Sequence, residues 1–250
     1  MYTGIDLGSR YIKIVRLDEN QEILEKRIFD SMDFFRNYGK LVDKIFYLNT
    51  NKLNIKESDK VTATGYGKHS INIKGVTKIS EQRAHMLGAY QQLKMRDFIL
   101  LDIGGQDTKI LEVKGLEIQD IIMNDKCGAS SGRYLENIAN VLQITLDELS
   151  SYWQEPVEIS NTCAVFGESE VLGKVFEGVS LSSIIAGANY SVYKRIGSQL
   201  NGIMEKTVIF TGGVAKNQAI RNILREKSGK NIIVPAEPQF NGAIGAAVFI

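Results

Sequence analysis

The chain has 250 residues, of which 44% are hydrophobic and 24% are charged, and it contains only three prolines. This composition is typical of a globular chain with a real apolar core and excludes a largely disordered one. The 30 basic and 29 acidic residues leave a net charge of +1, which excludes strong bulk attraction to nucleic acid or to an anionic membrane surface.

Membrane and secretory segments are not expected. No apolar run approaches the ~20 residues that a membrane-spanning helix needs. The first residues have neither the basic region nor the apolar region of a signal peptide. We therefore expect a cytoplasmic protein that binds no membrane and no nucleic acid. Cys127 and Cys163 are too few for a disulfide scaffold, and from spacing alone buried or incidental thiols are the ordinary interpretation.

Apolar runs and helical patterns alternate along the chain, which predicts an α/β fold. Residues 2–5 form a short apolar run before a glycine turn, and further apolar segments lie at 41–48 and 61–63. Helical spacing is found in four later segments, and one more strand ends at a proline. These segments are helices at 81–93, 184–200, 216–227 and 243–250, and the strand at 232–234.

One pattern occurs twice: Asp, an aliphatic residue, Gly, four residues, Lys and Ile. The first copy begins at Asp6 and the second at Asp102, and each follows a short apolar run and leads into another. Each copy therefore predicts a strand, a glycine-containing hairpin and a second strand. The repeat indicates two related halves, which we place at 1–95 plus 236–250 and at 96–235.

The repeated hairpin suits a phosphate group. Its glycine lets the backbone come close to a phosphate and lets successive N–H groups point at it. The aspartate at the end of the first strand lies where a hydrated Mg²⁺ needs a carboxylate. A single copy would more simply be a turn, but two copies with matched spacing favour phosphate binding from both halves.

A third glycine element follows a predicted strand at 208–211. Gly212 and Gly213 make a tight turn before the helix at 216–227, and such turns present backbone to a ligand, often a nucleoside. The sequence contains no G-x-x-x-x-G-K-[ST] and no G-x-G-x-x-G. These absences exclude a P-loop and the dinucleotide fingerprint.

Taken together, the motifs resemble the BadF/BadG/BcrA/BcrD-type ATPase family of the acetate kinase/sugar kinase/Hsp70/actin superfamily, which includes activators of 2-hydroxyacyl-CoA dehydratases. The likeness covers essentially the whole chain. One departure is local: the family's usual Cys-Ala-Ala-Gly-Thr-Gly-Arg is Cys-Gly-Ala-Ser-Ser-Gly-Arg here, so Ser130-Ser131 replaces Gly-Thr. The motifs that carry the resemblance are 101–107, 124–127, 161–171 and 211–217.

The resemblance implies an actin-like, ribonuclease H-like duplicated α/β fold with a nucleotide cleft between its two halves. It also implies a homodimer that holds one [4Fe-4S] cluster between its subunits. ATP hydrolysis would drive one electron at low potential to a partner iron–sulfur dehydratase or reductase, with ferredoxin or flavodoxin as donor. The partner would be a 2-hydroxyacyl-CoA dehydratase or, alternatively, a benzoyl-CoA reductase or a double-cubane cluster protein.

The two cysteines acquire a role in that setting. A cubane needs four thiolates, and one chain offers two, separated by 36 positions. Two chains related by a two-fold axis could supply all four. Cys127 and Cys163 each precede a helical pattern, and helix N-termini favour a nearby anion by roughly 0.3–1 kcal/mol each.

We assign the expected site residues as follows. The Mg²⁺ ligands, through water, are Asp6 and Asp102. The phosphate groups of ATP or ADP lie against Gly8, Ser9, Gly104 and Gly105, with the charge of Lys13 nearby. The attacking water is oriented by Gln106 or Asp107, so Asp102, Gln106 and Asp107 are the catalytic group. The rest of the nucleotide contacts Gly212, Gly213, Lys216 and Gln239, and the cluster ligands are Cys127 and Cys163.

Two alternatives use the same fold. A sugar or small-molecule kinase would transfer the γ-phosphoryl group to a hydroxyl and carry no iron. An assembly protein of the actin or Hsp70 kind would bind nucleotide without supporting a metabolic reaction. Against a kinase, the sequence shows no convincing catalytic aspartate in a substrate loop, and 250 residues is short for two substrate-holding halves.

Overall fold

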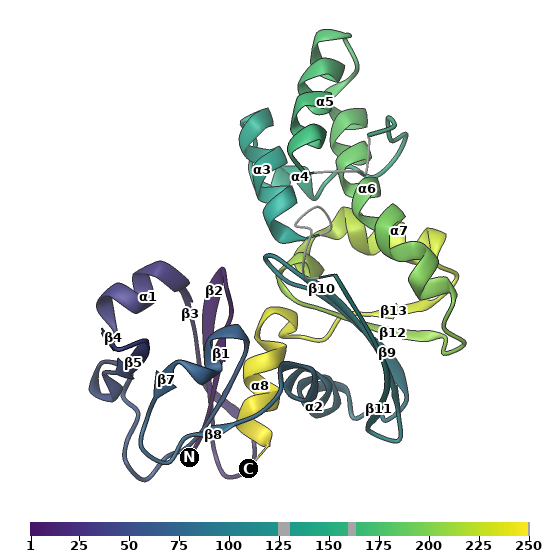
Figure 1. Cartoon of the computed structure of the whole chain (residues 1–250). Helices are drawn as coiled ribbons and strands as arrows, with labels where there is room; N and C mark the ends of the chain where they lie inside the picture. Colours follow the sequence, from purple (N-terminus) through teal and green to yellow (C-terminus); the bar gives the residue numbers. More distant parts are fainter. Residues whose placement is uncertain (125–130, 160–163, 250) are drawn as a thin grey trace. The chain divides into compact units, whose positions relative to one another are not determined.

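The computed structural model describes residues 1–124, 131–159 and 164–249, and for residues 164–166 it describes the backbone only. The chain divides into two compact units (Figure 1). The first consists of Met1–Arg96 and Phe240–Ile250, and the second of Asp97–Gln239. Each unit has its own sheet and its own helices, so the chain is α/β as its pattern predicts.

The first unit is built on a five-stranded sheet of order β3-β2-β1-β6-β8. Strand β1 pairs antiparallel with β2 and parallel with β6, while β3 continues the antiparallel side and β8 the parallel side. The β1–β2 pair is the strand–hairpin–strand that the first copy of the repeat predicts. The strands are β1 (Tyr2–Leu7), β2 (Tyr11–Leu17), β3 (Ile23–Asp30), β6 (Lys60–Thr64) and β8 (Thr77–Lys78).

Helices α2 (Glu81–Leu93) and α8 (Asn241–Val248) pack against each other, and α8 also contacts β1 (Figure 1). Small residues make this close contact possible. A Cβ on Gly245 would lie 1.6 Å from the carbonyl oxygen of Ala84, and one on Gly4 would lie 1.9 Å from that of Ala243. Helix α8 therefore closes the first unit, although its sequence lies at the far end of the chain.

A smaller layer completes the first unit. The apolar segment at 41–48 lies in a hairpin that turns at Asp43 and Lys44, which take positive φ angles of 48° and 66°. Phe34 and Phe46 are fully buried in the core between this layer and the sheet. The elements are α1 (Ser31–Asn37), β4 (Gly39–Val42), β5 (Ile45–Leu48), the 3-10 helix at Thr50–Leu53 and β7 (Ile71–Asn72), with sheet order β4-β5-β7.

The second unit repeats the sheet of the first. Its order is β11-β10-β9-β12-β13, with β9 antiparallel to β10 and parallel to β12. Strand β11 pairs antiparallel with β10, and β13 pairs parallel with β12. The second copy of the repeat is therefore also a strand–hairpin–strand. The strands are β9 (Phe98–Ile103), β10 (Thr108–Lys114), β11 (Glu117–Asn124), β12 (Thr207–Thr211) and β13 (Asn231–Ile233).

The described residues of the second unit form five α-helices, and the longest is α6 (Leu181–Asn201). It begins three residues before the predicted 184–200 because the hydroxyl of Ser180 caps it, accepting from the N–H of Ser183 at 3.2 Å. No helix in the described part of the chain is long and apolar enough to cross a membrane. The other helices are α3 (Gly132–Leu142), α4 (Leu146–Leu149), α5 (Ala164–Phe176) and α7 (Gln218–Lys227).

Candidate functional site

The hairpin between β1 and β2 places an ion pair beside its glycine. Asp6 lies opposite Lys13 in the antiparallel register, and the Lys13 ammonium is 3.2 Å from Oδ2 of Asp6. A Cβ on Gly8 would lie 3.3 Å from the same ammonium, so Lys13 reaches both the carboxylate and the turn. The hydroxyl of Ser31 donates to the carbonyl of Gly8 at 2.8 Å, and Ser9 at the tip is exposed.

Asp6 is nearly fully buried, and its second oxygen is suited to a cation or a cation-bound water. Oδ1 accepts no hydrogen bond from the described residues. A Cβ on Gly65 would lie 2.6 Å from Oδ1, and one on Gly242 would lie 3.2 Å from Oδ2 and 2.8 Å from Nε2 of His85. Glycine at both positions thus keeps space beside a buried carboxylate, which is the chemistry that a hydrated Mg²⁺ requires.

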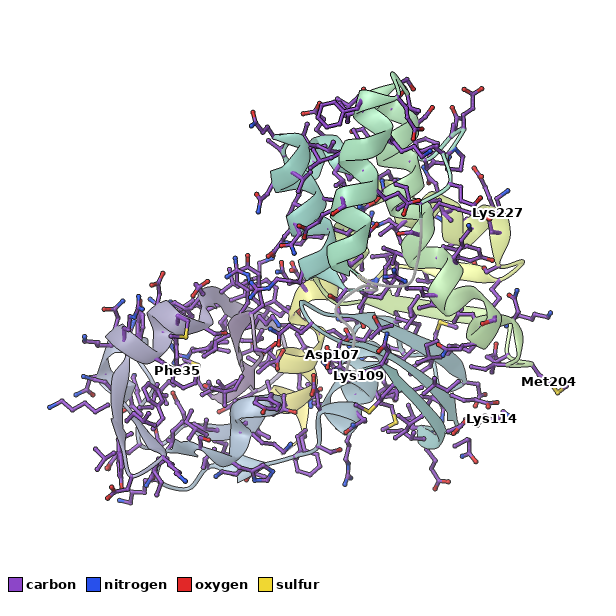
Figure 2. All side chains as sticks on the ribbon, turned by 45° about the horizontal axis from the view of Figure 1, so that its top comes forward. Phe35, Asp107, Lys109, Lys114, Met204 and Lys227 are labelled. Atoms are coloured by element: carbon purple, nitrogen blue, oxygen red, sulfur yellow. The ribbon has the colours of Figure 1, made fainter. Side chains whose placement is uncertain are left out.

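The hairpin between β9 and β10 repeats this register with a different partner. Asp102 lies opposite Lys109, and its Oδ1 accepts from the hydroxyl of Thr211 at 3.0 Å. The Lys109 ammonium lies 2.5 Å from Oδ2 of Asp107, a residue of the hairpin itself (Figure 2). The turn is closed by the N–H of Gly104, which donates to the carbonyl of Asp107 at 2.9 Å. Gln106 at the tip is exposed.

The glycine turn after β12 is fixed by backbone groups packed against it. Gly212 has φ +87° and ψ 177°, and a Cβ there would lie 2.2 Å from the carbonyl oxygen of Ile103. Only glycine fits such backbone. The N–H of Gly212 donates to the carbonyl of Pro238 at 2.9 Å, and Lys216 donates to Oε1 of Gln239 at 2.5 Å. The turn and residue 239 therefore form one surface.

The predicted helix at 216–227 begins later than expected. Lys216 belongs to a 3-10 turn, Gly213–Lys216, and α7 starts at Gln218. The reason is the side chain of Asn217, whose Oδ1 accepts from the N–H of Ile220 at 2.9 Å and so caps the helix. Its Nδ2 donates to Oδ1 of Asn189 in α6 at 2.9 Å. This buried amide pair joins the glycine turn to α6.

A matching turn follows β6 in the first unit. Thr64 lies beside Asp6 in the parallel register just as Thr211 lies beside Asp102. Gly65 has φ +86° and ψ −179°, almost identical to Gly212, and a 3-10 turn, Tyr66–His69, follows it. The duplication therefore extends beyond the hairpins to a second Thr-Gly turn.

The second hairpin also holds the start of α3. The N–H of Gly132 donates to the carbonyl of Gly104, and that of Arg133 donates to the carbonyl of Gly105, each at 2.9 Å. Ser131 is the N-cap residue of α3, but its side chain makes no capping bond. The hairpin carbonyls instead satisfy the first N–H groups of the helix, which every α-helix leaves without intrahelical partners.

Helix α3 is joined to α5 and α6. A Cβ on Gly167 of α5 would lie 3.3 Å from the Tyr134 ring, and the Tyr134 hydroxyl bonds to the hydroxyl of Ser191 in α6 at 3.0 Å. Asn137 donates to Oε1 of Glu168 in α5 at 3.0 Å. Burial raises the pKa of Tyr134, so its hydroxyl stays protonated at neutral pH. The helices that follow Cys127 and Cys163 in the sequence are thus packed together.

Comparison with known proteins decides the family. The sequence profile of the BadF/BadG/BcrA/BcrD ATPase family matches residues 3–249. The chain belongs to this ATPase family.

Relatives and solved structures agree. The chain is 38% identical over 257 residues to the activator of lactoyl-CoA dehydratase from Anaerotignum propionicum, covering 100% of this chain and 97% of the relative. It is 34% identical to the (R)-2-hydroxyglutaryl-CoA dehydratase activating ATPase from Acidaminococcus fermentans, covering 100% and 96%. The activator of 2-hydroxyisocaproyl-CoA dehydratase from Clostridium difficile, solved with bound ADPNP, matches with TM-score 0.84 and 33% identity, covering 100% and 94%. These matches confirm the ATPase assignment and the actin-like α/β fold.

In this ATPase the predicted residues fall into two groups, one in each unit. Asp6, Gly8, Ser9 and Lys13 lie together at the first hairpin. In the second unit the sheet carries a hairpin and a glycine turn side by side, since Thr211 contacts Asp102. The residues of this second group are Asp102, Gly104, Gly105, Gln106, Asp107, Gly212, Gly213, Lys216 and Gln239. The cluster candidates Cys127 and Cys163 lie outside the described residues.

Four residues of the site were missed by sequence reasoning. They are Thr64, His85, Lys109 and Thr211. Lys109 stands at the same place in the repeated pattern as Lys13, and both threonines precede a glycine at the end of an apolar run. The sequence therefore contained signals for three of them. Neither pattern indicates His85, because its approach to Asp6 depends on how α2 packs against α8.

Proposed function

We propose that the chain is an ATP-dependent electron-transfer activator. ATP hydrolysis would drive one electron at low potential from a [4Fe-4S] cluster, shared by two copies of the chain, to a partner iron–sulfur enzyme. The partner class best supported is a 2-hydroxyacyl-CoA dehydratase, because three relatives that align with the whole chain at 34–38% identity are named activators of such enzymes. Ferredoxin or flavodoxin would then reduce the cluster again by donating one electron to it.

The nucleotide part of the proposal is supported by the two hairpins and the glycine turn. Asp6 and Asp102 would hold Mg²⁺ through water, and the bound ion would supply charge neutralisation at the phosphates. The backbone of Gly8, Gly104 and Gly105 would face the phosphates, while Gly212 and neighbouring residues would contact the nucleoside. Hydrolysis adds water to the γ-phosphorus and releases ADP, phosphate and a proton, with the water oriented from the second hairpin.

The observation that carries the coupling is the pair of hydrogen bonds from Gly132 and Arg133 to the second hairpin. The helix that begins five positions after Cys127 starts directly on the turn that we propose to bind phosphate. Cys127 and Cys163 from each chain would hold the cluster, which supplies a one-electron carrier that loses one electron as the partner gains one. A change at the phosphates would reach the cysteine-bearing segment through this contact.

The proposal is tested with protein purified without oxygen. The wild-type chain should be brown, contain iron and hydrolyse ATP in the presence of Mg²⁺. Asp102→Asn removes the proposed Mg²⁺ carboxylate, so ATP turnover should fall at least about 100-fold, while the visible absorption of the cluster remains. Glu117→Gln on β11 is the matched control, since Glu117 is an exposed acidic residue outside the hairpin.

Other results would contradict specific parts of the proposal. Colourless protein that cannot be reconstituted with iron and sulfide would remove the electron-transfer function and leave an ATPase. Phosphorylation of an added sugar or other hydroxyl compound would favour the kinase alternative. Loss of cluster and turnover together in Asp102→Asn would show that the two sites are not separate.

A further inference from the structure

Lys109 is a buried cation in the second hairpin region. It lies on β10 with 1% of its surface exposed and is among the largest fully buried side chains of the chain. An ammonium taken out of water is strongly destabilised unless a charged partner compensates it. The Asp107 carboxylate supplies one, at 2.5 Å from the Lys109 nitrogen. Figure 2 labels the two residues next to each other.

Two contacts and a close approach to Gly104 fix Asp107 against the turn. Its Oδ2 is bound by Lys109, its carbonyl accepts the N–H of Gly104, and a Cβ on Gly104 would lie 2.8 Å from its Oδ1. The carboxylate is therefore held over the glycine that faces the proposed phosphate position. Its side chain remains 30% exposed, so it can also reach a ligand or water.

The first hairpin shows what is particular to this arrangement. Lys13 occupies the same register position as Lys109 but pairs with the strand aspartate, Asp6. The first hairpin has no acidic residue at the position that Asp107 occupies in the second, where the sequence has Tyr11. Only the second hairpin therefore combines a turn carboxylate with a buried lysine.

We infer that Lys109 is a positioning residue for ATP hydrolysis, acting through Asp107. A carboxylate beside phosphate oxygens is repelled by them and would turn away from the site. The Lys109 ammonium offsets that repulsion and orients the carboxylate, so that Asp107 is the hairpin residue that receives the attacking water. Gln106, the other candidate, is exposed at the tip of the turn. This inference rests on the proposed function and assigns the hydrolytic role within it.

A double-mutant cycle on the full-length chain tests the inference. The variants are Lys109→Met, Asp107→Asn and the combination of both, and the control is Lys114→Met, an exposed lysine at the end of the same strand. Each is measured for ATP turnover, KM for ATP, ADP affinity and thermal midpoint. Lys109→Met should lower kcat by about 100-fold, with KM and ADP affinity changed less than about threefold. Asp107→Asn should lower kcat by a similar factor.

The decisive comparison is between Asp107→Asn and the double variant. If Lys109 acts through Asp107, adding Lys109→Met to Asp107→Asn should change kcat by less than about twofold. The double variant contains neither member of the ion pair, so it keeps the comparison available if Lys109→Met alone does not fold. For that case Lys109→Arg, which retains the charge, is measured alongside and should keep more than a tenth of wild-type kcat.

Several results would overturn the inference. Equal kcat losses from Lys109→Met in the wild-type and Asp107→Asn backgrounds would show that Lys109 acts independently. Weaker ATP and ADP binding with unchanged kcat would make Lys109 a phosphate-binding residue. Unchanged kcat in Lys109→Met, with wild-type protein active, would refute the positioning role alone. A wild-type chain without MgATP hydrolysis would overturn both this role and the proposed function.

Discussion

At the scale of single residues, the two Thr-Gly turns share their backbone conformation and differ in the side chains around them. Thr64-Gly65 and Thr211-Gly212 adopt the same turn beside equivalent aspartates, with φ angles of +86° and +87° at the glycines. What distinguishes the second unit is the acidic residue in its hairpin and the surface formed by Lys216 with residue 239. Each unit therefore has the same backbone arrangement of a hairpin beside a Thr-Gly turn, and the side chains make the two arrangements different.

Replacing the glycine of the second turn tests how strictly this backbone is required. Gly212→Ala puts a Cβ 2.2 Å from the Ile103 carbonyl, in a φ, ψ region that is essentially restricted to glycine. We expect the free energy of unfolding to fall by about 2–4 kcal/mol and ADP affinity to fall with it. Urea unfolding followed by circular dichroism measures the first quantity, and calorimetric titration with ADP measures the second.

Gly229→Ala is the matched control for that substitution. Gly229 also has a positive φ, +63°, but a Cβ there would meet no atom within 4 Å. It should cost about 1 kcal/mol, the penalty of left-handed backbone without a clash, and leave ADP affinity unchanged. Equal effects at the two glycines would show that the close approach to Ile103 has no energetic consequence.

Much of the candidate site could be predicted from the sequence because it is made of short local patterns. Asp6 and Gly8, or Asp102 and Gly104, are brought together by one hairpin, whose spacing is visible in the sequence. Thr211 is brought to Asp102 by the parallel pairing of strands more than 100 residues apart, and no local pattern encodes that distance. The pairing of Lys109 with Asp107 also depends on side-chain packing.

At the scale of elements, helix boundaries were predicted within a few residues where capping residues are local. Helix α2 spans the predicted residues, while α6 and α7 start where Ser180 and Asn217 cap them. The start of α3 could not be predicted in the same way. Its first N–H groups bond to Gly104 and Gly105, which lie almost thirty residues earlier in the chain.

This non-local cap leads to a prediction about coupling. Gly132→Pro removes the N–H that donates to Gly104, while a proline is well accommodated at the first position of a helix. The preceding Ser131 is extended, with φ −127° and ψ 172°, as a residue before proline prefers. We expect a loss of about 1 kcal/mol in unfolding free energy. The second expected effect concerns the rate at which a chelator extracts iron from the reconstituted protein. We expect this rate to differ less between the ATP-analogue state and the ADP state in the variant than in the wild type.

Gly132→Ala supplies the comparison, because it adds a Cβ at the same place but keeps the N–H. That Cβ would lie 3.2 Å from the Gly104 oxygen, which requires only a small adjustment. The alanine variant should therefore retain the nucleotide dependence of iron extraction. If the alanine and proline variants reduce the nucleotide dependence of iron extraction equally, the space at residue 132 matters and the hydrogen bond does not.

At the scale of the whole molecule, the two units share a duplicated sheet and differ in the elements that each adds to it. Each unit has the same five-stranded order around a central hairpin. Between β11 and β12 the second unit carries helices α3 to α6, whereas the first unit has α1, β4 and β5 between β3 and β6. Helices α3 and α5 each follow a cysteine in the sequence. Composition and the repeat predicted the duplicated part, whereas the meaning of the inserted helices came from family resemblance.

The inserted helices lead to the last prediction, which concerns oligomeric state and iron together. Four cysteine thiolates for one cubane require two chains, so anaerobic protein should contain about two iron atoms per chain and behave as a dimer. Removing iron with a chelator should shift the mass in light scattering toward the 27.8 kDa of a single chain, because a shared metal centre stabilises the state that binds it. Cys163→Ser should give the same shift and no cluster absorption, whereas Asp102→Asn should remain an iron-containing dimer. Four iron atoms in a stable monomer would contradict a shared centre and require ligands other than the two cysteines.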